Sequence, residues 1–128
     1  MSNIPHDLRY TTDHEWLRDS GAVHTVGISQ FAVDQLGDIT LVELPAIGRT
    51  VAKGDAVGTI ESVKSVSEIY APVSGTIKRI NERLKDEPEL VNSAPYGDGW
   101  MLEIEPSDQA ELAGLMDAAA YEAHLAAQ

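Results

Sequence analysis

The chain has 128 residues, 43% of them hydrophobic and 23% charged, a composition that predicts a globular protein with one sizeable core. Its formal net charge of −12 argues against nucleic acid and acidic membranes as partners, because phosphate contacts need Lys and Arg. The absence of cysteine excludes disulfide bonds and cysteine-bound metals, so the sulfurs for any dithiol chemistry must come from an attached group.

Targeting and metal-binding signals are missing from the sequence. Residues 1–7 lack the basic and apolar segments of a secretory signal, and no apolar run is long enough to span a membrane. We therefore expect a complete chain that stays in the cytoplasm. The four histidines are scattered, which argues against a metal site, and no hydrolase or phosphate-binding motif occurs.

The first third of the chain predicts short strands around one helix. Residues 8–10 favour a short edge strand, and residues 22–28 alternate apolar and polar side chains as a half-buried strand does. Ser29 is the predicted N-cap of a helix that Gly37 ends. Residues 38–44 predict the next strand. Between the first two strands, we interpret His14 as a partly buried structural residue and Trp16 as a core residue.

The centre of the chain is a predicted hairpin with Lys64 at its tip. Residues 56–60 and 66–70 are rich in β-branched and aromatic side chains, whereas residues 61–65 between them are polar except for Val63. Most surface lysines are simply solvated charges. Lys64, however, is the only one of four lysines midway between two apolar runs, and a tip lysine is an accessible amide-forming group.

The last third of the chain predicts strands separated by a long connection. Residues 76–80 favour a strand, and the highly charged residues 81–88 are predicted to lie on the surface. Residues 89–100 are rich in turn formers and predict a long irregular loop, in which Tyr96 and Trp100 pack on the core.

A final strand and a helical tail complete the prediction. Residues 101–105 alternate as a strand does, and Ser107 is the predicted N-cap of a tail rich in alanine and leucine. We therefore predict a single domain over residues 1–128, with a β core at about 8–105 and a helical tail at about 107–127.

Four separated groups of residues resemble the glycine cleavage system H-protein family, which belongs to the biotinyl/lipoyl carrier class. They are His14-Glu15-Trp16, Val42-Glu43-Leu44-Pro45, the run Glu61-Ser62-Val63-Lys64 with residues 69–75 after it, and Asn92, Pro95-Tyr96 and Gly99-Trp100. The resemblance implies a mainly β barrel-sandwich hybrid of two small antiparallel sheets, with a short internal helix and a C-terminal helical tail.

The resemblance also implies a function in glycine catabolism and one-carbon metabolism. It implies a non-catalytic carrier, with lipoic acid attached to Lys64 and with Glu61, Ser62, Val63 and Ser65 forming the attachment site. Lipoate-attaching enzymes would load the lysine. The lipoyl arm would accept an aminomethyl group of glycine from the P protein and present it to the T protein, and the L protein would reoxidise the dithiol.

A receiving cleft for the loaded arm is a further implication of the resemblance. Glu15 matches the family residue that lies in this cleft, and the resemblance places Asp13 and Glu68 around it. Such carboxylates would face the positive charge of the aminomethyl group. We expect the protein to be a monomer and to meet its enzymes through their basic surfaces.

Two other classes of protein remain open from the residues. A lipoyl or biotinyl domain of another multienzyme complex would share the hairpin, but it would lack the pattern of residues 92–100, and biotin acceptors usually flank the lysine with methionines rather than with Val63 and Ser65. An unmodified β-domain that acts only as a binding module would leave Lys64 as a solvated charge. Intact-mass measurement separates this last class from the carriers.

Overall fold

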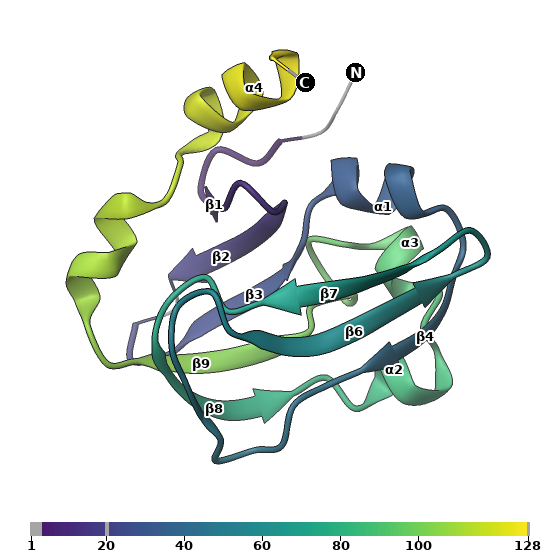
Figure 1. Cartoon of the computed structure of the whole chain (residues 1–128), viewed down its shortest axis with the longest axis horizontal. Helices are drawn as coiled ribbons and strands as arrows, with labels where there is room; N and C mark the ends of the chain where they lie inside the picture. The colour runs from purple at the N-terminus through teal and green to yellow at the C-terminus, as the bar shows by residue number, and fades with distance from the viewer. Residues whose placement is uncertain (1–3, 20, 128) are drawn as a thin grey trace.

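Two antiparallel sheets form most of the structure, a computed structural model that describes residues 4–19 and 21–127 (Figure 1). The larger sheet has six strands in the order β1-β2-β3-β9-β8-β5, and the smaller has three in the order β4-β6-β7. The bounds of the first sheet are β1 Arg9–Tyr10, β2 Glu15–Asp19, β3 His24–Ile28, β9 Leu102–Pro106, β8 Gly75–Ile80 and β5 Thr50–Val51. Those of the second are β4 Ile39–Glu43, β6 Ala56–Ser62 and β7 Val66–Tyr70. The predicted mainly β fold with two antiparallel sheets is confirmed.

The main core lies where apolar side chains of both sheets meet. It includes Val26, Ile77 and Ile104 from the six-stranded sheet and Val42, Ile60 and Ile69 from the three-stranded sheet. Each is at most 4% exposed. Burial of such side chains is the main favourable contribution to folding, at about 25 cal/mol per Å² of apolar surface. The packing leaves the outer face and the tip of the β6–β7 hairpin at the surface.

The internal helix α1, Gln30–Leu36, follows the predicted signals closely. The Ser29 hydroxyl accepts the backbone N–H of Ala32, and Gly37 ends the helix with a φ of 79°. Val33 and Leu36 face the core. Both predicted ends of the helix are confirmed, so the chain enters β4 at a defined point beside the hairpin tip.

Three stretches differ from the prediction. The charged segment at residues 81–88 contains helix α2, Arg83–Asp86, and both Asn81 and Leu84 are buried. The Asn81 amide enters the interior because it donates to the backbone carbonyls of Asp98 and Trp100. The predicted irregular loop contains helix α3, Leu90–Ser93, and strand β2 lies where no strand was predicted. Contacts with distant residues decide these elements, so local pattern did not indicate them.

The C-terminal tail is helical but interrupted. It forms the 3-10 helix η1, Gln109–Gly114, and the helix α4, Ala118–Ala126. Asp108 and Asp117 are their N-caps, so the prediction of Ser107 as the N-cap is wrong. Met116 lies between the helices and exchanges two backbone hydrogen bonds with Tyr10. The tail therefore runs alongside the strand β1 at this point (Figure 1). Among the described residues, no helix has the length and hydrophobicity needed to cross a bilayer.

Candidate functional site

The tip of the β6–β7 hairpin is a closed turn held by Ser62. The two strands pair in register up to Glu61 and Val66, and the N–H of Ser62 then donates to the carbonyl of Ser65 at 2.8 Å. The Ser62 hydroxyl oxygen accepts the backbone N–H of Lys64 at 3.2 Å and that of Ser65 at 3.1 Å. One side chain thus stabilises the turn that presents the lysine.

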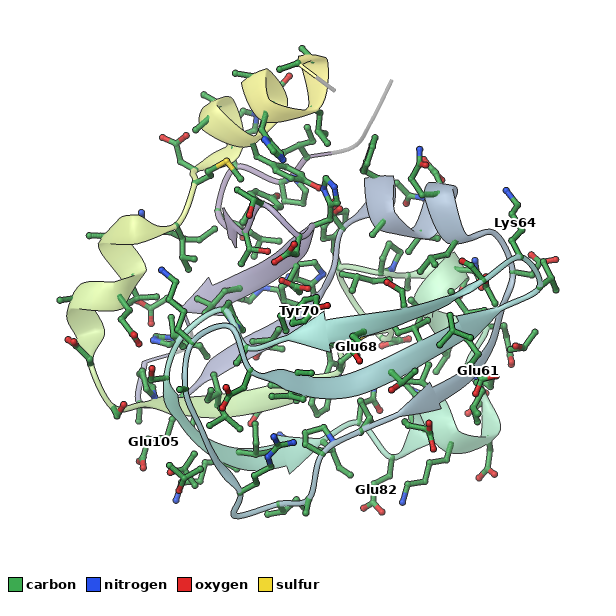
Figure 2. The ribbon with its side chains drawn as sticks, in the orientation of Figure 1. Glu61, Lys64, Glu68, Tyr70, Glu82 and Glu105 are labelled. Carbon is green, nitrogen blue, oxygen red and sulfur yellow. The ribbon has the colours of Figure 1, made fainter. Side chains whose placement is uncertain are left out.

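Lys64 projects from this turn at one end of the molecule (Figure 2). Its side chain is exposed, and within residues 4–19 and 21–127 its ammonium takes part in no ion pair. The neighbouring Val63 and Val66 are 66% and 65% exposed, which is unusual for apolar residues. The lysine is therefore accessible, forms no ion pair with a described residue, and is flanked by apolar side chains.

Replacing Ser62 by alanine is expected to loosen the tip without unfolding the protein. The substitution removes the acceptor of two backbone N–H groups, and in so exposed a turn the loss in unfolding free energy is about 0.5–1 kcal/mol. Amide exchange at Lys64 and Ser65 should accelerate several-fold. Ser65→Ala is the matched control, because no hydrogen bond of the Ser65 hydroxyl occurs in the described part of the chain. Unchanged exchange in Ser62→Ala would contradict the assigned role.

A pocket of about 250 Å³ lies near the opposite end of β7. Its walls come from four segments: residues 10–13 with Glu15, residues 53–54, residues 70–72 and residues 114–116. The pocket thus lies between the turn before β2, the far end of the hairpin and the C-terminal tail. It brings Asp13 and Glu15 together with residues more than 35 positions away along the chain.

Glu15 is buried beside this pocket and joins the two sheets. Its side chain is 2% exposed, the Thr11 hydroxyl donates to Oε1 at 2.6 Å, and the backbone N–H of Tyr70 donates to Oε2 at 3.3 Å. Burial raises the pKa of the Glu15 carboxyl to about 7, although these two hydrogen bonds favour the charged form. A carboxyl group that changes charge near neutral pH therefore lies at the pocket wall.

The backbone before Glu15 is held in place by the C-terminal helix. His14 has a φ of 73°, in the left-handed region, and its carbonyl accepts the N–H of Ser29 at 2.8 Å. The ring Nδ1 of His14 is 2.8 Å from the hydroxyl of Tyr121, which is also 2.6 Å from the Ser29 hydroxyl. Burial lowers the pKa of His14. The structure therefore places His14 in a partly buried, structural position.

Tyr70 is a pocket residue that sequence reasoning missed. Its pKa is raised, chiefly by the charge of Glu68 and further by Asp13 and Glu15. These are the three carboxylates that the resemblance placed around the cleft. Asp13 is exposed at the pocket wall, whereas Glu68 is exposed on β7 outside the lining. Figure 2 shows Glu68 and Tyr70 along the strand. The sequence feature that could have indicated Tyr70 is the alternation of side chains along a strand, because it puts residues 68 and 70 on the same face.

The tail wall of the pocket is fastened by Glu111. The carboxylate accepts the backbone N–H of Ser74 at 2.7 Å and the Ser74 hydroxyl at 3.0 Å, and the Ser74 hydroxyl oxygen in turn accepts the N–H of Lys53. The Lys53 ammonium lies beside Gly114, where an added Cβ would be 3.4 Å from Nζ. Among the described residues, no group of three or more His, Asp or Glu side chains is arranged to hold a metal ion.

Comparison with known proteins agrees with this arrangement. The model of the glycine cleavage H-protein family matches residues 8–128. The chain belongs to this family. The glycine cleavage system H protein of Marinobacter nauticus is 52% identical over 129 residues and covers 100% of this chain and 99% of its own length. That of Micrococcus luteus is 55% identical over 126 residues, with 97% and 98% covered.

A solved structure gives the same result for the fold. The crystal structure of a glycine cleavage system H protein from Mycobacterium marinum superimposes with a TM-score of 0.87 at 37% identity, covering 96% of this chain and 99% of that one. H proteins are non-catalytic carriers of lipoate.

Proposed function

We propose that the chain is the lipoyl carrier of a glycine cleavage system, with lipoic acid joined through an amide to Lys64. It moves the aminomethyl group of glycine from the P protein to the T protein, and the L protein reoxidises the dithiol. The observation that carries the proposal is an exposed lysine at the tip of a hydrogen-bonded turn, without an ion pair to any described residue, in a member of the H-protein family.

The residues around Lys64 fit this group. Amide formation removes the charge of the ammonium, and no ion pair of the described residues is broken when it does. Ser62 keeps the backbone of the turn rigid, while Glu61, Val63 and Ser65 complete a surface on which the attaching enzyme can dock. When bound, lipoate supplies two sulfurs that the cysteine-free chain lacks.

Glu15 is our candidate for holding the positive end of the carried group. An ammonium beside this carboxyl would favour its charged form and be held by a charge-assisted hydrogen bond. Asp13 at the pocket wall and Glu68 on β7 add negative charge to the approach. Tyr10 and the residues around Met116 form an apolar part of the same pocket, which limits access of water.

The proposed partners follow from the glycine cleavage system and from the negative net charge of the chain. We propose the P, T and L proteins and a lipoate-attaching enzyme as partners, meeting a cytoplasmic, monomeric carrier whose single domain covers residues 1–128. The net charge of −12 favours basic docking surfaces on these enzymes, and such contacts weaken as salt screens them.

The lifetime of the loaded carrier tests the proposal. Lipoylated protein is incubated with the P protein and isotopically labelled glycine, purified, and followed for loss of label without enzymes. Glu15→Gln should lose its label roughly tenfold faster, because a hydrogen bond to a charged group contributes about 1.5–3 kcal/mol. Asp13→Asn is the matched control from the exposed wall of the same pocket, and its rate should change by less than about threefold.

The two steps of this experiment report on different parts of the proposal. Failure of the wild type to take up label would contradict the carrier function itself. Normal uptake with equal rates of loss in wild type and Glu15→Gln would leave the carrier function in place and remove Glu15 from it.

A further inference from the structure

The hairpin tip rests on the backbone between α1 and β4. The N–H of Val63 donates to the carbonyl of Asp38 at 3.0 Å, one residue before the acceptor lysine. The stem of Lys64 lies beside Gly37, where an added Cβ would be 3.2 Å from Cε. Gly37 has φ 79° and ψ −149°, a conformation open essentially to glycine alone. The position of residues 37–39 therefore decides the position of the tip.

Asn92 holds this supporting backbone at two points. Its Nδ2 donates to the carbonyl of Gly37 at 2.8 Å, and its Oδ1 accepts the N–H of Ile39 at 2.9 Å. These two bonds bracket Asp38, the residue that receives the N–H of Val63. A carboxamide has a donor and an acceptor on one planar group, so asparagine satisfies both backbone groups at once. Neither aspartate nor alanine can do so.

The element that carries Asn92 is itself firmly anchored. The adjacent Val91 is fully buried in the core. Beyond the helix, the carbonyl of Pro95 accepts the indole N–H of Trp16 at 2.9 Å, and the Tyr96 hydroxyl accepts the N–H of Gln30 at the start of α1 at 2.9 Å. The segment therefore fixes both ends of α1, directly at Gln30 and through Asn92 at Gly37.

We propose that Asn92 is a positioning residue for Lys64, acting through the backbone of residues 37–39 to fix the direction in which the amine is presented to the enzyme that acylates it. The inference rests on the proposed function, in which Lys64 is the acceptor. Within the described part of the chain, the hydrogen bonds of the Asn92 side chain go to the backbone of Gly37 and Ile39 and not to Lys64. Its contribution is to the geometry of approach, to which such reactions are sensitive on the scale of about 1 Å.

The acyl transfer that depends on this geometry is an ordinary amide synthesis. The neutral amine of Lys64 attacks the carbonyl carbon of a lipoyl adenylate made from lipoate and ATP by the attaching enzyme. The C–N bond forms as the bond from carbon to the phosphate oxygen breaks, and AMP leaves. The amide nitrogen keeps one of the three hydrogens of the original ammonium, and two protons pass to solvent or enzyme. No oxidation or reduction occurs.

The test compares Asn92→Asp and Asn92→Ala with the wild-type protein in two measurements. The first is the rate of lipoylation by a purified lipoate–protein ligase with lipoate and ATP, analysed as kcat and as KM for the carrier. The second is hydrogen exchange of the Val63 amide. Ser93→Ala is the matched control on the same helix, because within the described residues its hydroxyl makes only a long 3.5 Å contact with the Leu90 carbonyl.

We expect kcat to fall on the order of tenfold in Asn92→Ala, which corresponds to one or two lost hydrogen bonds, and KM to change by less than about twofold. Exchange at Val63 should accelerate by a similar factor. Asn92→Asp keeps the bond from Ile39 but turns a carboxylate oxygen toward the Gly37 carbonyl oxygen, and because these two acceptors repel each other, both effects should be at least as large as in Asn92→Ala. A residue that only stabilised the fold would lower the melting temperature and leave the kcat of the folded protein unchanged.

Wild-type kcat and wild-type protection of Val63 in a folded Asn92→Ala would overturn the inference. So would a rise in KM with unchanged kcat, since Asn92 would then shape the docking surface instead. If Asn92→Ala does not fold, the isosteric Asn92→Asp decides the question alone. If the wild type is not lipoylated at Lys64, the proposed function fails. Faster hydrogen exchange of the Val63 amide in the Asn92 variants would still show that Asn92 holds the tip.

Discussion

Lys64→Arg is expected to abolish lipoylation completely while leaving the fold unchanged. Arginine keeps the positive charge and most of the stem, but its guanidinium does not form the amide. The residue is exposed and forms no ion pair within the described part of the chain, so its replacement should change the free energy of unfolding by less than about 0.5 kcal/mol. Co-expression with a lipoate ligase, followed by intact-mass measurement, should show one lipoyl group on the wild type and none on the variant.

Lys78→Arg is the matched control for this experiment. Lys78 is also exposed, but it pairs with Glu105 at 3.7 Å and lies on β8 of the six-stranded sheet rather than at a hairpin tip. The control should be lipoylated as fully as the wild type, and peptide mapping should place the group on Lys64. A lipoyl group that persists in Lys64→Arg would show that another lysine is the acceptor.

The stability of the wild-type protein is expected to fall by about 3 kcal/mol, relative to Glu15→Gln, as the pH rises from about 4.5 to 7. Burial raises the pKa of Glu15 from 4.5 to about 7, so in this interval the folded state keeps a proton that the unfolded state has released. The contribution of the protonated Glu15 to the free energy of unfolding is therefore complete below pH 4.5 and is lost as the pH rises toward 7. Each tenfold change in proton affinity corresponds to about 1.4 kcal/mol, which gives the stated size.

Urea unfolding at several pH values measures this dependence. Glu15→Gln resembles the protonated carboxyl in shape and stays neutral, so its curve should lack the fall, and its stability should exceed that of the wild type most clearly above pH 7. Glu68→Gln removes the same charge from an exposed site and should follow the wild type. Parallel curves for wild type and Glu15→Gln would mean that Glu15 ionises as freely in the folded protein as in the unfolded one.

This pH dependence and the carrier role that we propose for Glu15 concern the same carboxyl group. In the empty pocket, the ionised Glu15 is destabilising because burial separates its charge from water. An ammonium placed beside it would offset that cost, so the loaded carrier should be more resistant to unfolding at neutral pH than the unloaded one. The fold thus keeps a partly uncompensated charge at the position where the proposed cargo brings an opposite one.

The β6–β7 hairpin and the helix α1 were determined by the local sequence itself. The β-branched runs around Lys64 predicted the hairpin, and Ser29 and Gly37 predicted both ends of α1, because strand propensity, helix capping and positive φ act over a few neighbouring residues. The family motifs predicted the fold class, which the family match and the solved structure confirm. The roles of the site residues stay predictions.

Only the tertiary structure decided how these elements act together. Glu15 accepts a hydrogen bond from Tyr70, 55 positions away, and the support of the hairpin tip depends on the contact between Asn92 and Gly37, also 55 positions apart. The interruption of the tail arises in the same way, because Met116 pairs with Tyr10 instead of continuing a helix. Composition and periodicity report which residues are apolar and how they repeat, but a hydrogen bond between distant segments depends on where the packed core places their backbones.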